Sequence, residues 1–321
     1  MGIGLVAILG LLLGVVLGAE LHKRRRLSFI SRYSRYAIAI YTGDSLDHLR
    51  PAVGVPCPVL TAADVTDLQV QFVADPFMVL DNGKWCMFFE IMNAATECGV
   101  IGLARSKDGF HWSYESVIIR ESFHLCYPYV FDWESTYYMT LASPEEGAVR
   151  LYTAQEFPKR WEHTQNLVAG VLHDPSPFRF GGRWWMLATG LPDIYGALRL
   201  FSSDTLTGEW KEHPKSPVVA GDRRFARPAG RVLVLGDRVI RFAQDCKRYY
   251  GRAVRAFEVT RLTPTEYEER PLGSKAILGP SWWGWNSKGM HSIDAHQLAD
   301  GTWIACVDGK RAINRVGVFR G

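Results

Sequence analysis

The sequence has little of what marks several common protein classes. Among its 321 residues are six cysteines, and none of them forms a Cys-x-x-Cys or Cys-x-x-x-Cys pair. This spacing argues against a zinc site and against a disulfide framework. The sequence also has no glycine-rich phosphate-binding loop, which argues against P-loop and Rossmann folds. The net charge is only +4, so nothing indicates a nucleic-acid-binding protein.

One pattern, by contrast, occurs five times. Each copy opens on a polar or aromatic residue, runs into an apolar segment, and after a turn gives an aromatic-rich strand. The five openings are Asp75-Pro76-Phe77, Tyr127-Pro128-Tyr129, Asp174-Pro175-Ser176, Arg227-Pro228-Ala229 and His291-Ser292-Ile293-Asp294. The prolines of the first four openings are 52, 47 and 53 residues apart. A period of about 50 residues with several short strands per copy predicts an all-β fold, a five-bladed β-propeller over residues 36–321.

The first strand of this region is expected to belong to the last blade. The last repeat ends early, at residues 316–319, whereas segment 36–41 resembles a third strand of the repeat. Closing the ring in this way removes exposed strand edges. Three tryptophans that follow third strands, Trp112, Trp161 and Trp210, are expected to pack between blades.

Residues 1–22 have the composition of a membrane anchor. Gly2–Ala19 is an uncharged run of 18 residues, just long enough to cross a bilayer as one transmembrane helix. A cleaved signal peptide and a buried soluble helix are the alternatives. The basic cluster Lys23–Arg26 follows the apolar run instead of preceding it, which favours an uncleaved anchor.

The flanking residues predict how this anchor is oriented. By the positive-inside rule, the basic juxtamembrane linker 23–35 and the propeller are expected on the cytoplasmic face of the membrane. Gly10, Gly14 and Gly18 share one helix face, a pattern that favours a helix-mediated dimer. The alternative is that glycine is simply frequent in membrane helices.

The openings of the repeats supply the candidate catalytic residues. In a propeller the innermost strand of each blade lines the central axis, so these distant positions are expected to converge. Asp75 and Asp174 are candidate acid–base groups, although an aspartate before proline often only shapes a turn. Arg227 offers a permanently charged fork for a phosphate or carboxylate. Tyr127 is a candidate substrate-binding residue.

The last opening adds His291, Asp294 and His296 as candidates. A histidine here would titrate near neutrality or hold a metal ion, and a structural role is the alternative for each. We therefore expect no certain cofactor, with a metal ion near His291 as the one option.

Second-strand ends and one loop complete the list. Glu90 and Asp245 follow apolar strands and are candidate substrate-binding residues, whereas Asp308 is expected in a solvated turn. The segment before His291 contains Trp283 and Trp285, whose indole faces suit contact with sugar or lipid. The alternative is an aromatic plug between blades.

These residues carry a family resemblance. Asp75-Pro76-Phe77, Asp174-Pro175-Ser176 and His291 resemble the five-bladed propellers of glycoside hydrolase family 43. The strings 72–77, 127–129, 226–230 and 291–296 are more similar still to the N-terminal domain of plant glucosamine inositolphosphorylceramide transferases and its stand-alone bacterial relatives. The similarity covers roughly residues 35–321.

The resemblance implies roles for some of these residues. In the hydrolases a first-blade aspartate is the general base and a third-blade aspartate orients, which match Asp75 and Asp174. The general acid of the fourth blade is replaced here by Arg227, which cannot donate a proton at physiological pH. Ordinary glycosidase chemistry would then need another acid, such as Glu90 or Asp245. The plant proteins' transferase domain lies outside the resemblance, so their transferase activity is not implied.

Two functions follow as expectations. The first is a membrane-anchored, carbohydrate-active propeller that performs glycosyl transfer or hydrolysis at an activated sugar, with a glycan or glycolipid precursor as its substrate. The second is a non-catalytic glycan-binding or scaffolding propeller. Replacement of the acid by Arg227 favours the second, and retention of Asp75 and Asp174 favours the first.

Overall fold

The computed structural model describes residues 27–320, which form two compact units. The larger unit is Tyr36–Arg311, and the described part of the smaller unit consists of residues 27–35 and 312–320. The predicted anchor 1–22, with Gly10, Gly14 and Gly18, lies outside the described residues. No helix among the described residues has the length and hydropathy needed to span a membrane. From residue 27 onward, the predicted linker 23–35 is part of a strand.

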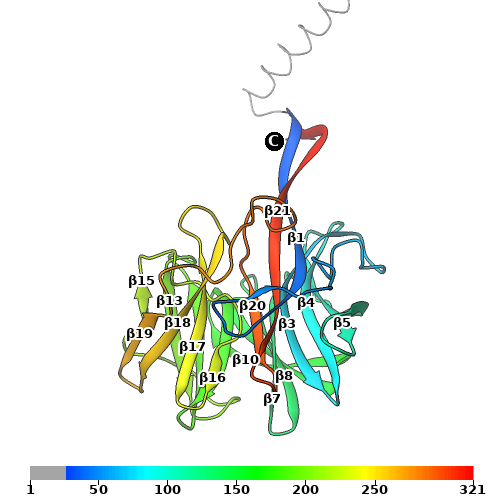
Figure 1. Cartoon of the computed structure of the whole chain (residues 1–321). Helices are drawn as coiled ribbons and strands as arrows, with labels where there is room; N and C mark the ends of the chain where they lie inside the picture. The colour runs from blue at the N-terminus through cyan, green and yellow to red at the C-terminus, as the bar shows by residue number, and fades with distance from the viewer. Residues whose placement is uncertain (1–26, 321) are drawn as a thin grey trace, which may run out of the picture. The chain divides into compact units, whose positions relative to one another are not determined.

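The larger unit is a five-bladed β-propeller, as the repeats predict (Figure 1). The first blade contains β3 (Val70–Asp81), β4 (Lys84–Asn93), β5 (Gly99–Ser106) and β6 (Trp112–Ile119). The second contains β7 (Cys126–Trp133), β8 (Thr136–Ser143), β9 (Ala148–Glu156) and β10 (Arg160–Ala169). The third contains β11 (Leu172–Phe180), β12 (Arg183–Gly190), β13 (Ala197–Ser203), β14 (Lys211–Glu212) and β15 (Val219–Ala220). The fourth contains β16 (Leu233–Leu235), β17 (Arg238–Asp245), β18 (Ala253–Leu262) and β19 (Tyr267–Pro271).

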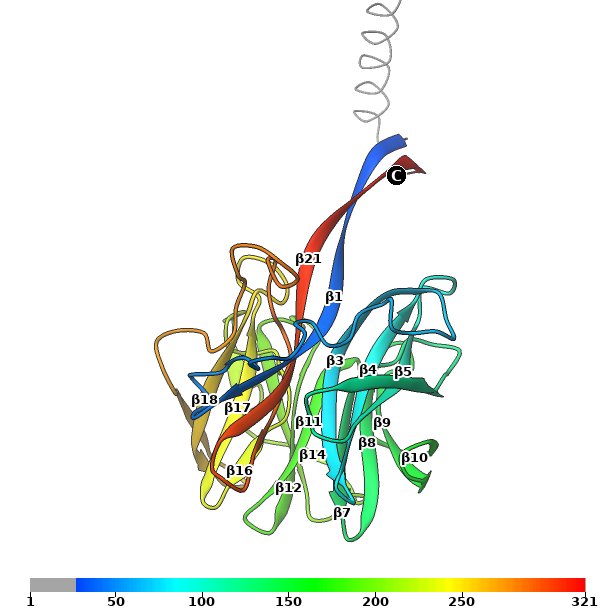
Figure 2. The ribbon, with the colours of Figure 1, turned by 45° about the vertical axis from the view of Figure 1, so that its right-hand side comes forward.

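The fifth blade combines distant parts of the chain. Its strand order is β2 (Arg50–Pro51), β1 (Leu27–Gly43), β21 (Trp303–Arg320) and β20 (Ile293–Gln297). β1 and β21 lie side by side in both views of the ribbon (Figures 1 and 2). The prediction that segment 36–41 completes the last blade is therefore confirmed.

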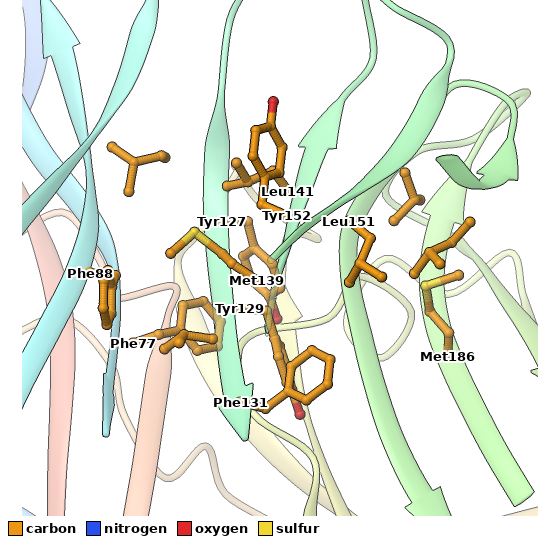
Figure 3. Close-up of a cluster of buried hydrophobic side chains, with 14 of the residues drawn as sticks. Phe77, Phe88, Tyr127, Tyr129, Phe131, Met139, Leu141, Leu151, Tyr152 and Met186 are labelled. Carbon is orange, nitrogen blue, oxygen red and sulfur yellow. The ribbon is translucent and has the colours of Figure 1, made fainter. Parts of the chain in front are cut away.

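Aromatic side chains fill the space between the blades. Phe77 of the first blade lies edge-on to Tyr127 of the second, with ring centroids 4.9 Å apart, and close to Tyr129 at 5.1 Å (Figure 3). Trp161 packs edge-on against Phe88 at 5.6 Å, which joins the second blade to the first. Trp112, Trp161 and Trp210 all pack against core clusters, as predicted.

A distortion at the same point of the repeat shapes the first three inner strands. Asp75, Tyr127 and Asp174 have φ values of 51°, 55° and 53°, in the left-handed region that side chains other than glycine rarely adopt. At each of them the register with the second strand shifts. Such bulges add twist and re-aim a side chain, and strain of this kind is frequent at functional sites.

One ion pair occupies the axis deeper in the propeller. The Nε of Arg231 donates to Oδ1 of Asp294 at 2.5 Å, and an Nη donates to the carbonyl of Val130 at 2.9 Å. Asp294 also accepts the backbone N–H of Met78 at 2.7 Å. Burial raises the pKa of Asp294, but Arg231 and His296 outweigh burial and bring that pKa to about 2. The pair thereby links four blades.

Removing one member of this pair is expected to destabilise the propeller strongly. Arg231→Met leaves the Asp294 carboxylate buried without its cation, which typically costs about 3–5 kcal/mol in the free energy of unfolding. Urea denaturation measures this loss. The double variant Arg231→Met/Asp294→Asn should recover most of the loss, because no uncompensated buried charge remains.

The matched control is an exposed pair. Arg261 lies 3.0 Å from Glu266 on the surface, so Arg261→Ala should change stability by less than about 1 kcal/mol. Equal losses in the Arg261 and Arg231 variants would contradict the structural role of the axial pair.

Candidate active site

Strand direction brings the predicted catalytic residues together. The inner strands start at the end of the blades where the second strands finish. Asp75, Asp174, Arg227 and His291 all lie at this end and are almost fully buried. They form two connected groups, which we call together the axial cluster.

The first group is built around Asp308. Its Oδ1 lies 2.7 Å from Nδ1 of His291 and accepts the backbone N–H groups of His291 and Ser292. Its Oδ2 accepts the backbone N–H of Asp75 at 3.0 Å. The prediction of a solvated turn for Asp308 is therefore wrong: the strand β21 continues past this residue, and its side chain is completely buried.

This arrangement sets the state of His291. Because a carboxylate only accepts hydrogen bonds, Nδ1 of His291 must carry a proton. The other ring nitrogen, Nε2, faces Oδ1 of Asp75 at 3.5 Å. Burial lowers the pKa of His291, but the charges of Asp308 and Asp75 outweigh burial and raise it overall. The raised pKa favours the doubly protonated ring, in which Nε2 would also carry a proton toward Asp75.

The second group is an arginine fork on Asp174. Nε and one Nη of Arg227 donate to the two carboxylate oxygens of Asp174 at 2.6 and 3.2 Å. Gln244 donates from its side-chain amide to Asp174 and to the carbonyl of Pro228, both at 2.9 Å. The other Nη of Arg227 has no hydrogen-bond partner among the described residues. Most of the predicted anion-binding fork is therefore occupied by Asp174.

Two carboxyl groups of the axial cluster have no such dedicated partner. Burial raises the pKa of Asp75 to about 7, against the opposing charge of His291. Burial, together with the charges of Asp75, Asp308 and Asp174, raises the pKa of Glu90 well above its ordinary value. The closest cationic candidate for Glu90 is His124, whose Nε2 is 3.6 Å away. Burial lowers the pKa of His124, so this ring is mostly neutral at pH 7.

Tyrosines and a lysine surround the two groups. The rings of Tyr36 and Tyr250 lie 4.9 and 5.2 Å from the His291 ring. The guanidinium of Arg227 lies over the rings of Tyr250 and Tyr195 at 5.1 and 5.4 Å. Lys310 donates from Nζ to the carbonyl of Tyr250. Apart from Arg227 and His291, these residues lie outside the repeat openings, and Gln244, Asp308 and His124 were likewise outside the predicted site.

The side chains of the other predicted site residues have their main contacts outside these two groups. The Tyr127 hydroxyl is 2.9 Å from that of Ser176 within the core, and Asp245 is flanked by Arg255 and Arg252 at 3.3 and 3.6 Å. Asp294 belongs to the deeper axial ion pair. His296 lies 3.1 Å from Asp294, and its ring lies edge-on to an indole of the first blade.

The two predicted tryptophans, Trp283 and Trp285, have different surroundings. Trp283 is exposed, whereas Trp285 packs against the core of the fourth and fifth blades. The axial cluster therefore contains Asp75, Glu90, Asp174, Arg227 and His291 of the predicted set.

Asp75, His291 and Asp308 lie close enough together to be compared with a metal site. One ligand atom from each lies within 4.8 Å of the others. However, Asp308 already accepts four N–H donors, and Nδ1 of His291 is committed to it. Only Nε2 of His291 and the Asp75 carboxylate are left, which is fewer than the ligands that zinc or calcium takes. The residues therefore fit a hydrogen-bonded pair of His291 and Asp308 better than a metal centre.

Comparison with known proteins places the chain. Residues 36–310 match the family described as "Glucosamine inositolphosphorylceramide transferase 1, N-terminal". The chain belongs to this family. It is 34% identical over 299 residues to glucosamine inositolphosphorylceramide transferase 1 of Oryza sativa subsp. japonica and 31% identical to that of Arabidopsis thaliana. These alignments cover 86% of this chain but only 40% and 39% of the two relatives.

Solved structures share the fold of this family member. A putative glycosidase from Bacteroides thetaiotaomicron VPI-5482 superposes with a TM-score of 0.61 at 11% identity, over 82% of this chain and 97% of the other. The catalytic domain of a Coprinopsis cinerea GH62 α-L-arabinofuranosidase gives 0.57 at 12% identity, over 75% and 92%. At these identities the likeness concerns the propeller fold alone.

The raised pKa of Asp75 predicts a pH-dependent effect of Asp75→Asn. In the folded protein this carboxyl keeps its proton up to about pH 7, whereas the ordinary value is 3.8. The stability that the proton provides is complete below the ordinary pKa and is lost as pH rises through the folded pKa. The unfolding free energy of Asp75→Asn should therefore increase relative to the wild type from pH 4 to 7, by at most about 1.4 kcal/mol per pH unit.

Urea denaturation over this pH range measures the difference. Asp132→Asn, a change at an exposed aspartate, is the control and should give a difference independent of pH. A pH-independent difference for Asp75→Asn as well would contradict the perturbed carboxyl.

Proposed function

We propose that this propeller is a carbohydrate-active domain whose reaction takes place at the axial cluster. The proposal rests on a difference among the buried carboxyl groups of this cluster: some have hydrogen-bond partners of their own and others have raised pKa values. Asp174 and Asp308 have dedicated partners, whereas Asp75 and Glu90 have raised pKa values. Perturbed ionisable groups gathered at one place are typical of active sites.

The chemistry would be glycosyl transfer or hydrolysis at an activated sugar. Asp75, with a pKa of about 7, is partly ionised at neutral pH and would take the proton of the attacking water or hydroxyl group. Glu90, whose pKa burial raises well above its ordinary value, would keep its proton and give it to the leaving oxygen. Glu90 would thus supply the acid that Arg227 cannot.

Arg227 and His291 would have supporting roles. Arg227 holds Asp174 with two of its nitrogens, and its remaining Nη would contact an anionic group of the substrate, such as a sugar phosphate. His291, oriented by Asp308, would stabilise the ionised form of Asp75.

The names of the relatives and the predicted anchor support a proposal for the substrate class. The relatives' name refers to transfer to inositolphosphorylceramide, a glycolipid precursor, although this chain spans only about 40% of their length. We propose a glycan or glycolipid precursor here too, with the propeller tethered by residues 1–22 and, from the Lys23–Arg26 cluster, on the cytoplasmic face.

A non-catalytic glycan-binding propeller is the second candidate. It is favoured by Arg227 in the place of the acid and by the fork on Asp174, which leaves a single Nη for a ligand. Such a module would need the cluster for shape and binding rather than for proton transfer.

Single substitutions at the two free carboxyl groups separate these candidates. For an enzyme, Asp75→Asn and Glu90→Gln should each lower kcat by about 100-fold or more while ligand binding persists, because general acid–base groups contribute at this level. Turnover would be screened with sugar phosphates, nucleotide sugars and aryl glycosides, and binding by calorimetry with the same compounds.

Asp132→Asn is again the matched control and should keep full activity. Unchanged turnover in Asp75→Asn would remove this residue as the base. Binding without turnover in the wild type, lost in Arg227→Ala, would instead support the binding module.

A further inference from the structure

Two adjacent indole rings protrude into solvent just before the last inner strand. Trp282 and Trp283 are 101% and 84% exposed, whereas Trp285, two residues later, packs against the core. Proteins rarely leave such apolar surface uncovered unless it meets a partner.

The base of this loop is built to hold the two rings outward. The Ser281 hydroxyl donates to the side chain of Asn286, which is buried and donates to Sδ of Met290 at 3.3 Å. The backbone N–H of Lys288 donates to the carbonyl of Lys310 at 2.8 Å, and the Lys310 N–H donates back to Gly289 at 2.9 Å. The exposure of the indoles is therefore a property of an ordered loop.

Exposed cations occur in the same loop and in a turn that contacts it. Lys288 belongs to the same loop, and Lys247 and Arg248 belong to the turn between β17 and β18. The two segments touch, because the N–H of Met290 donates to the carbonyl of Arg252. In that turn Asp245 pairs with Arg252 and Arg255, and neither Lys247 nor Arg248 forms an ion pair with another described residue.

Tyr249, in the same turn as Lys247 and Arg248, is 42% exposed. We call this surface the aromatic–basic patch; its members are Trp282, Trp283, Tyr249, Lys247, Arg248 and Lys288.

We propose that the aromatic–basic patch docks the propeller on a bilayer surface that contains anionic lipid. Indole rings favour the headgroup region of a bilayer, and lysine and arginine are attracted to anionic headgroups. A patch that combines indole rings with lysine and arginine matches the surface of an anionic bilayer better than it matches a protein partner or a free sugar.

The predicted anchor keeps such a surface within reach. Tyr36, the first residue of the larger unit, contacts the His291 ring, at the same end of the blades as the patch. Only residues 20–35 separate it from the apolar run Gly2–Ala19, a distance of at most about 55 Å for an extended chain. The inference rests on the membrane anchor of the proposed function, but not on the chemistry of the axial cluster.

Tryptophan fluorescence of the full chain in vesicles tests the docking. All 11 tryptophans lie between Trp85 and Trp303, so the predicted anchor contributes no signal. We expect brominated acyl chains to quench the fluorescence in vesicles that contain phosphatidylserine. Trp282→Gln/Trp283→Gln should remove at least half of the quenching.

Two further variants define the interaction. Leu80→Gln changes an exposed apolar residue at the opposite end of β3 and should leave the quenching unchanged. Lys247→Glu/Arg248→Glu should reduce the quenching in phosphatidylserine vesicles to the level seen with phosphatidylcholine alone.

Several outcomes would overturn the docking. One is the absence of quenching in wild-type protein that floats with the vesicles, and another is an equal loss in the Leu80 variant. Fluorescence changes at Trp282 and Trp283 with soluble oligosaccharides, without lipid quenching, would identify a glycan platform instead. Failure to float would overturn the anchor and the docking together. Intact quenching in a protein without turnover would leave the docking standing and count against the catalytic proposal alone.

Discussion

Two buried carboxylates of the fifth blade, Asp294 and Asp308, join it to the first blade and close the ring. Both the propeller and its axial cluster depend on these contacts. The inner edge of β3 presents backbone N–H groups to the axis, where no further strand can pair with them. Asp308 accepts the N–H of Asp75, and Asp294 accepts that of Met78. Buried N–H groups left without acceptors would be costly. The same atoms that close the ring therefore fix the backbone of the candidate base.

Closure by carboxylates also determines the charge pattern along the axis. Each buried carboxylate needs compensation, and the protein supplies it differently at the two depths. Asp294 is neutralised by Arg231, which makes the deeper level a permanent ion pair. Asp308 is instead satisfied by N–H donors and by His291, whose second nitrogen remains directed at Asp75. The deeper level is thus an ion pair, while burial at the outer level raises the pKa of Asp75 to about 7.

The sequence predicts most of the fold and about half of the axial cluster, for a physical reason. Inner-strand positions recur with the repeat, so Asp75, Asp174, Arg227 and His291 could be aligned and their convergence anticipated. Asp308 and Gln244 lie on second strands, where a polar residue at the end of an apolar run looks the same whether it faces the axis or solvent. Tyr36 and Tyr250 reach the cluster from the closing strand and from a loop, whose paths no local pattern determines. Asp294, with its neighbour His296, lies at a depth along the axis that the repeat could not distinguish.

Arg227 pairs with Asp174 and leaves Asp75 and Glu90 without an arginine partner. Its fork holds Asp174 as an ion pair, and Asp308 is held by four donors, so neither is available as a proton carrier. Asp75 and Glu90 come from adjacent strands of one blade, where Ala74 and Glu90 are direct cross-strand partners. Two neighbouring buried carboxyl groups cannot both ionise readily, so one keeps its proton while the other loses it first. The first blade therefore supplies two neighbouring buried carboxyl groups with raised pKa values, whereas the fourth blade contributes the guanidinium of Arg227.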